Sequence, residues 1–190
     1  LSVDIHDSTI NGPGTINAVQ VPNGILLIDT AGGTIADNTI SALHHTWSPS
    51  LSGAVLQHQA RDGIVVSGNE ILDTDDAVLI AGTDLATVSG NNLHNNFKGV
   101  QIEATSSNNN ILNNLIQNNT FGIFANATAG LGNTITNNDF EGATDNVTDV
   151  HLETAGAVLV GSNNQFGGDT FFIENLTTQD INLVGTGSTF

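Results

Sequence analysis

A recurring asparagine is the feature that most constrains how this chain can fold. Six asparagines are each followed, two positions later, by a large apolar residue. The asparagines are Asn38, Asn69, Asn91, Asn114, Asn138 and Asn164, and their apolar partners are Ile40, Ile71, Leu93, Ile116, Phe140 and Phe166. Successive asparagines are 31, 22, 23, 24 and 26 residues apart. A unit repeated at this spacing predicts a solenoid with about one repeat in each coil.

The residues between the asparagines are typical of short strands. Residues 77–80 (AVLI), 99–102 (GVQI) and 122–125 (GIFA) begin with a small residue and are bounded by Gly, Asn, Asp and Ser. Such runs indicate strands, and no window of 11 or more residues shows a helical apolar period. Each unit is therefore expected to contain three strands and three turns, and stacked units close into a rod.

The asparagine has a physical role in such a rod. Asn tolerates left-handed backbone angles and forms hydrogen bonds with nearby backbone groups. When coils stack at the strand spacing of about 4.8 Å, equivalent amides can bond in a ladder. We expect a ladder through Asn69, Asn91, Asn114 and Asn138. The side chains expected to point inward are Val78, Ile80, Val100, Ile102, Ile123 and Ala125.

Three segments carry a resemblance to a known family. Residues 66–71 (VSGNEI), 88–93 (VSGNNL) and 134–140 (TITNNDF) resemble repeats of the pectin-lyase-like superfamily, in the form of Asn-rich regions of secreted or surface bacterial proteins. The resemblance covers roughly residues 33 to 170. It implies an all-β, right-handed parallel β-helix of about eight rungs. Because this scaffold carries lyases, hydrolases, epimerases and adhesins alike, it implies a fold and not a function.

The composition of the chain limits which partners it can bind and in which compartment it is expected. Lys and Arg total 2 against 19 acidic residues, which gives a net charge of −17. Such a surface repels phosphate backbones, so we expect no nucleic acid partner. No apolar run approaches 18 residues, so no membrane span is expected. The absence of cysteine fits an extracellular or cell-surface protein.

The organisation expected is one domain over residues 1–190 with a loop insertion near 41–52. The first ten residues and residues 171–184 read as strands, and no capping helix is evident. Uncapped coils expose strand edges. We therefore expect the ends to be covered by rungs of a longer chain or by neighbouring subunits stacked end to end.

An acidic turn, Asp73-Thr74-Asp75-Asp76, precedes the strand at 77–80. The Asp75-Asp76 pair resembles the carboxylates of polygalacturonases, and the repeat places Lys98 one rung above Asp76. If the chain is an enzyme, Asp75, Asp76 and Lys98 are its candidate catalytic residues. The pattern departs from that family, because residues 53–56 (GAVL) hold no third aspartate and residues 100–103 (VQIE) replace its cationic strand. We therefore predict no activity on pectin, alginate or similar uronans.

The same turn admits two other interpretations. Asp73, Asp75 and Asp76 are hard oxygen ligands and could bind calcium. Alternatively they form a solvated acidic turn, because the chain has no dedicated calcium-loop motif. Calcium is the one cofactor that the sequence suggests.

The insertion is the second candidate site. Residues 41–52 include the only tryptophan, Trp47, and the adjacent His44 and His45. Insertions in a solenoid emerge as loops, often on the binding face. Trp47 could stack on a sugar, with His44 and His45 as further ligand-binding residues. Alternatively His44, His45 and His58 could converge on a metal, or the loop could pack onto the rod.

Two functions remain open. The first is a secreted or cell-surface structural or adhesive module that binds carbohydrate. The alternative is a polysaccharide-active enzyme, namely a lyase, hydrolase or epimerase. In an enzyme the carboxylates should converge, whereas in a structural rod they should point outward into solvent.

Overall fold

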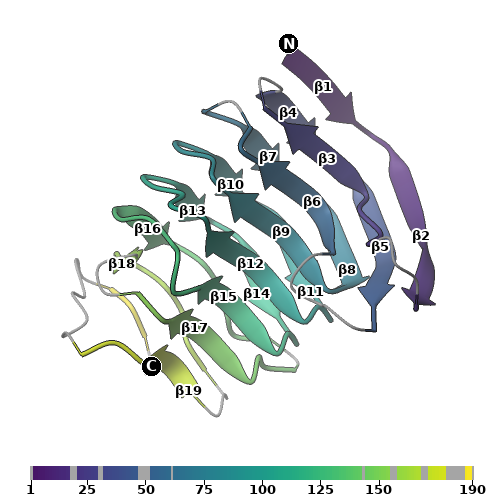
Figure 1. Ribbon diagram of the computed structural model, residues 1–190. Helices are drawn as coiled ribbons and strands as arrows, with labels where there is room; N and C mark the ends of the chain where they lie inside the picture. The colour runs from purple at the N-terminus through teal and green to yellow at the C-terminus, as the bar shows by residue number, and fades with distance from the viewer. Residues whose placement is uncertain are drawn as a thin grey trace.

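The computed structural model describes residues 2–17, 21–29, 32–46, 52–60, 62–142, 144–154, 158–167, 171–178 and 187–189. All the regular elements in these residues are β-strands. The strands stack as successive coils, from β1 at the amino-terminal end to β19 near the carboxyl-terminal end (Figure 1). They form three parallel sheets that run along the stack.

The three sheets are named A, B and C here. Sheet A contains, in spatial order, β1 (Ser2–His6), β4 (Gly32–Ala36), β7 (Val65–Ser67), β10 (Thr87–Ser89), β13 (Asn110–Leu112), β16 (Asn133–Thr136) and β18 (Val158–Val160). Sheet B contains β2 (Thr9–Ile16), β5 (Thr39–His45), β8 (Glu70–Thr74), β11 (Asn92–His94) and β14 (Leu115–Gln117). Sheet C contains β3 (Ile25–Ile28), β6 (Gly53–His58), β9 (Asp76–Ala81), β12 (Lys98–Glu103), β15 (Phe121–Ala125), β17 (Thr148–Leu152) and β19 (Phe171–Asn175).

The core is a column of apolar side chains enclosed by the three sheets. In sheet A, Val66 lies opposite Val88, which lies opposite Ile111 in the next coil. The six side chains expected to point inward are all buried. The aromatic pair Phe140 and Phe166 stacks in the core with ring centroids 5.1 Å apart. The predicted parallel β-helix is therefore confirmed.

The asparagine ladder runs along the corner between sheets A and B. Each side-chain Nδ2 donates to the Oδ1 of the next asparagine, at 2.9 Å from Asn38 to Asn69, 3.0 Å from Asn69 to Asn91 and 2.9 Å from Asn91 to Asn114. It continues at 2.9 Å to Asn138 and at 3.3 Å to Asn164. Each Oδ1 also accepts the backbone N–H of the preceding asparagine. The predicted ladder is confirmed, and it satisfies backbone groups that the corner would otherwise leave unpaired.

A left-handed residue precedes every ladder position. These residues are Asp37, Gly68, Gly90, Asn113, Asn137 and Asn163, with φ between 54° and 64°. Only Gly, Asn and Asp adopt this conformation at low cost, which explains the residue types at the corner. Serines occupy the equivalent position at both ends. Asn38 Oδ1 accepts the backbone N–H of Ser8, and Ser188 Oγ accepts that of Asn164.

The prediction of a loop over residues 41–52 is wrong for residues 41–45. Residues 41–45 belong to β5, because Leu43 is buried in the core and lies opposite Thr74 in β8. Ser52 is buried next to β6. Trp47 lies outside the described residues, so its predicted role stays a prediction, as does the single-domain assignment.

The strands expected at the ends are present over residues 2–6, 9–16 and 171–175. β1, β2 and β3 each pair on one side only, so this end presents open strand edges within the described residues. What covers the ends stays a prediction. No helix in the described part of the chain is long and apolar enough to cross a membrane.

We predict that Asn114→Ala destabilises the rod by about 3 kcal/mol or more, because each buried donor left without a partner costs about 1–3 kcal/mol. The change leaves the backbone N–H and Nδ2 of Asn91 without their acceptor and removes the bond to Val88 O. Urea unfolding monitored by circular dichroism measures the loss. Asn110→Ala, at an exposed position of the same coil, is the control and should change the free energy of unfolding little.

Candidate functional site

The outward face of sheet C differs from those of sheets A and B. Sheet A presents mostly small polar side chains, such as Thr87, Ser89 and Thr134, whereas sheet B presents a mixture that includes Glu70, Leu72 and His94. Every described phenylalanine outside the core lies on sheet C or in the turn leading into it. These residues are Phe97, Phe121, Phe124, Phe171 and Phe172. Aromatic area is thus gathered on one side of the rod.

Lys98 lies on the outward face of sheet C, next to the inward-pointing Gly99. A Cβ on Gly99 would lie 2.6 Å from Gly122 O and 2.9 Å from the core atom Cγ2 of Ile116, so this position points inward and admits no side chain. Val100, the next residue, is also buried in the core. The usual alternation of a strand is therefore shifted by one residue, and Lys98 lies outside the core although it is two positions from Val100.

Lys98 and Asp76 form a buried ion pair. The two residues lie opposite each other in β12 and β9, as predicted, and Lys98 Nζ lies 3.1 Å from Asp76 Oδ1. Asp76 is 0% exposed and Lys98 is 2% exposed. The ammonium also lies 4.9 Å from the ring centroid of Phe97 and 5.3 Å from that of Phe124. Aromatic rings thus flank the cation.

Burial dominates the acidity of Asp76. Removal of the carboxylate from water raises the pKa of Asp76 to about 7, although the attraction of Lys98 acts in the opposite direction. Asp75 and Glu103 add to the rise. A carboxyl group with a pKa near 7 exchanges its proton close to neutral pH, which is the property that general acid catalysis requires.

The structure joins two candidate sites that the sequence left separate. His44 Nδ1, in β5, lies 3.1 Å from Asp75 Oδ1, and the backbone N–H of His45 donates to Asp75 Oδ2 at 2.6 Å. His44 keeps a side chain that is 33% exposed, whereas His45 is buried. His44, Asp75 and the adjacent Asp76 therefore meet at the corner between sheets B and C.

The three aspartates considered as possible calcium ligands have different surroundings. Asp73 is an exposed residue in a left-handed conformation, Asp75 is held by β5, and Asp76 is paired with Lys98. Among the described residues, no three His, Asp or Glu side chains form a group that could hold a metal ion. The solvated acidic turn is wrong for Asp75 and Asp76, because both are buried.

Next to Lys98 lies a cluster of rings that we name the aromatic face: Phe97, Phe121, Phe124 and His151. Phe124 stacks on His151 with centroids 4.4 Å apart and an interplanar angle of 9°. Phe121 is inclined at 87° to Phe97, 75° to Phe124 and 66° to His151. Phe121 is half-buried and, among the described residues, stacks on no other ring.

Polar groups border the aromatic face. His151 Nδ1 lies 2.6 Å from Glu174 Oε2, where it can donate a hydrogen bond. Gln101 Nε2 donates to Glu103 Oε2 at 2.5 Å, and Asn126 Nδ2 donates to the same oxygen at 3.0 Å. These groups resemble the few polar contacts that orient a ligand in a largely apolar site.

Several buried polar atoms of this face lack hydrogen-bond partners. Within the described residues these are Asp76 Oδ2, Gln101 Oε1 and His151 Nε2, the last 3.5 Å from Glu153 Oε1. An unpartnered buried polar atom costs about 1–3 kcal/mol. Native proteins keep few of them, and in the described residues others lie at the buried Gln57 of β6 and at Asn92 of β11.

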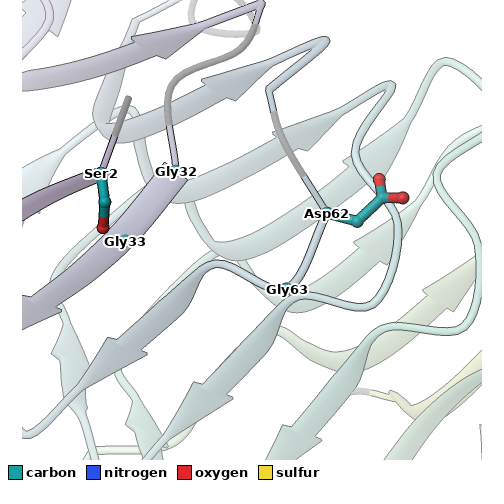
Figure 2. Close-up of a pocket in the computed structure, with 5 residues that line it drawn as sticks. All are labelled: Ser2, Gly32, Gly33, Asp62 and Gly63. Carbon is teal, nitrogen blue, oxygen red and sulfur yellow. The ribbon is translucent and has the colours of Figure 1, made fainter.

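A second feature is a hollow of about 300 Å³ beside β1 and β4. It is lined by Ser2, Gly32, Gly33, Asp62 and Gly63, and the Asp62 side chain extends away from Ser2 (Figure 2). Glycine backbone and one hydroxyl supply little chemistry. The outward face of sheet C is therefore the stronger candidate.

Most of the site was missed by sequence reasoning. Phe121, Phe124, Gln101, Glu103, His151 and Glu174 were not singled out. The signal that could have found part of the group is the repeat itself. Its register places Gln101 opposite Phe124, and His151 opposite Phe124 and Glu174.

Comparison with known proteins supports the fold. The family model described as a right-handed β-helix region matches residues 2–175. No curated protein sequence matches the chain. Among solved structures, the DFA-IIIase from Arthrobacter chlorophenolicus A6 in complex with GF2 is similar, with a TM-score of 0.53 and 18% sequence identity. The match covers 98% of this chain and 46% of that chain, so the present chain spans under half of its length. At this identity the likeness shows the fold alone.

We predict that Asp76 titrates near pH 7 and that Lys98→Met moves its pKa further upward, because the substitution removes the attraction that favours the carboxylate. Carbon-13 NMR of the Asp76 carboxyl measures both values. The folded pKa exceeds the ordinary value of 3.8, so the stability that protonated Asp76 contributes is fully present below pH 3.8 and is lost as the pH rises through about 7. A midpoint near 4 in the wild type would contradict the burial argument.

Proposed function

This chain belongs to the family of right-handed β-helix regions, and we propose that it is a carbohydrate-binding module that holds a saccharide on the aromatic face of sheet C. The observation that carries this proposal is that the phenylalanines outside the core, among the residues the structure describes, all lie on sheet C or in the turn before it. A rod with a purely structural role has no need for this asymmetry.

The aromatic face offers both kinds of contact that a sugar needs. Phe121 is half-buried and lacks a stacked ring partner within the described chain, so its ring is available to the apolar side of a sugar. Glu103 and Glu174 are partly exposed and can accept hydrogen bonds from sugar hydroxyls. His44 lies partly exposed at the corner between sheets B and C.

The energetics of the face support the same proposal. A buried ion pair such as Asp76 and Lys98 contributes little net stability, because desolvation of both charges offsets their attraction. The unpartnered Oε1 of the buried Gln101 reduces stability further. Features that lower stability and gather at one place are characteristic of functional sites. The similar structure, a DFA-IIIase in complex with GF2, adds support from the same fold.

We predict that Phe121→Ala weakens saccharide binding by about tenfold or more, since one stacked ring supplies on the order of 1.4 kcal/mol. Isothermal titration calorimetry with GF2 and a panel of neutral and acidic polysaccharides measures the affinity. Leu131→Ala removes an exposed apolar side chain elsewhere and is the matched control. Thermal unfolding of both variants separates lost binding from lost folding. Equal affinities of the wild type and Phe121→Ala would contradict binding at this face.

A second candidate function is cleavage of a glycosidic bond with Asp76 as the general acid. The raised pKa of about 7 favours it, because the carboxyl would hold a proton near neutral pH. Asp76 is 0% exposed, so the side chains that cover it must move before it can reach a sugar oxygen. Asp75, which is held by His44 and the backbone of His45, adds to the rise in the pKa of Asp76.

We predict that, if this second function holds, Asp76→Asn abolishes release of reducing sugar while saccharide affinity stays within about twofold of the wild type. Reducing-end assays across pH 5–9 with the same panel measure turnover. If the wild-type protein binds a saccharide but does not cleave it, catalysis is contradicted and saccharide binding is supported.

A further inference from the structure

We infer that the ligand of the aromatic face is an uncharged, hydroxyl-rich glycan, and that Glu103 and Glu174 exclude glycans that carry carboxylate or sulfate groups. This inference rests on the proposed function, because it concerns the ligand of the same face. It names the ligand class and the two residues that determine it.

The two glutamates flank the ring of Phe124. Gln101, Phe124, His151 and Glu174 lie opposite one another in consecutive strands β12, β15, β17 and β19. Adjacent strands are about 4.8 Å apart, so the backbone of Glu174 lies roughly 10 Å from that of Phe124. Glu103 lies two residues beyond Gln101 in β12, at a similar distance. Both carboxylates are therefore within about one Debye length of a sugar on Phe124 at 0.1 M salt.

The described basic groups that border the aromatic face are already engaged by acids, and the exposed His58 of β6 lies two strands away from Glu103. Lys98 lies against Asp76, and its side chain is 3% exposed. His44 is held by Asp75 and His151 by Glu174. A ligand carboxylate would therefore meet carboxylates without gaining a free cation. Like charges brought together in this way cost several kcal/mol, and the net charge of −17 adds long-range repulsion.

The hydrogen-bonding groups also match hydroxyls better than anions. Glu103 and Glu174 accept hydrogen bonds, and Gln101 Oε1 is a buried acceptor without a partner. A sugar hydroxyl can donate to such acceptors. A ligand carboxylate or sulfate offers only acceptors, so it cannot donate to Gln101 Oε1 or to the remaining lone pairs of the two glutamates.

The test compares each neutral glycan with its own charged derivative. Soluble cellulose, dextran, galactan and mannan oligomers, each in neutral and carboxymethylated form, are titrated into the full chain at 50 mM and 1 M NaCl. We expect the neutral form of the bound glycan to bind at least tenfold more tightly at 50 mM NaCl. The difference should shrink at 1 M NaCl, because salt screens the repulsion.

The double variant Glu103→Gln/Glu174→Gln should bind the carboxymethylated form at least threefold more tightly than the wild type does. Glu70→Gln, an exposed glutamate on sheet B, is the control and should leave both affinities unchanged. Equal or tighter binding of the carboxymethylated form by the wild type would overturn this inference while leaving carbohydrate binding intact. If the double variant still prefers the neutral glycan to the same degree, the role of the two glutamates is overturned. Failure of every glycan to bind would overturn the proposed function itself.

Discussion

The asparagine ladder at the corner between sheets A and B is the interaction on which the rest of the rod depends. Its amides join successive coils from Asn38 to Asn164, and every Oδ1 that accepts a side chain also accepts a backbone N–H. The ladder therefore fixes both the spacing of the coils and their register. Register in turn decides which side chains of sheet C meet, because a one-residue slip would exchange the inward and outward sides of each strand.

Asparagine side chains also join successive coils by hydrogen bonds at the other two corners, where they form two further ladders. Asn119 Nδ2 donates to Asn146 Oδ1 at 2.9 Å between sheets B and C, and Asn109 Nδ2 donates to Asn133 Oδ1 at 2.8 Å between sheets C and A. With the corners held in this way, the aliphatic core fills the space between the sheets. The outward side of sheet C is then free to carry side chains that do not serve stability. The buried Asp76–Lys98 pair, the unpartnered Gln101 Oε1 and the ring cluster lie there.

The fold could be predicted from the sequence because its main signal is periodic. The Asn-x-apolar unit located the first ladder, the core positions and the stacking of Lys98 on Asp76. The other two ladders were not found, since Asn96, Asn109 and Asn119 occur among other asparagines and identity alone does not show which of them turns inward. The strand through His45 was mistaken for a loop because the length of the repeat there suggested an insertion, whereas Leu43 anchors the segment in the core.

The candidate site could be predicted only in part. Asp75, Asp76 and Lys98 stood out by charge, but their contacts depend on the inward position of Gly99, which shifts the alternation of β12. The pairing of His44 with Asp75 joins residues 31 positions apart across a corner. Phe121 and His151 are also brought together through stacking of coils. These side chains form a candidate site only because stacked coils bring them together, and no local sequence motif predicts that contact.

The most direct measurement is an NMR titration of the isotopically labelled chain with a neutral oligosaccharide that it binds. Binding on the aromatic face predicts saturable shifts in the backbone amides of β12, β15 and β17 and in the ring signals of Phe121 and Phe124, with sheets A and B little changed. Shifts confined to the ends of the rod or to sheets A and B, with the signals of Phe121 and Phe124 unmoved, would contradict carbohydrate binding on sheet C.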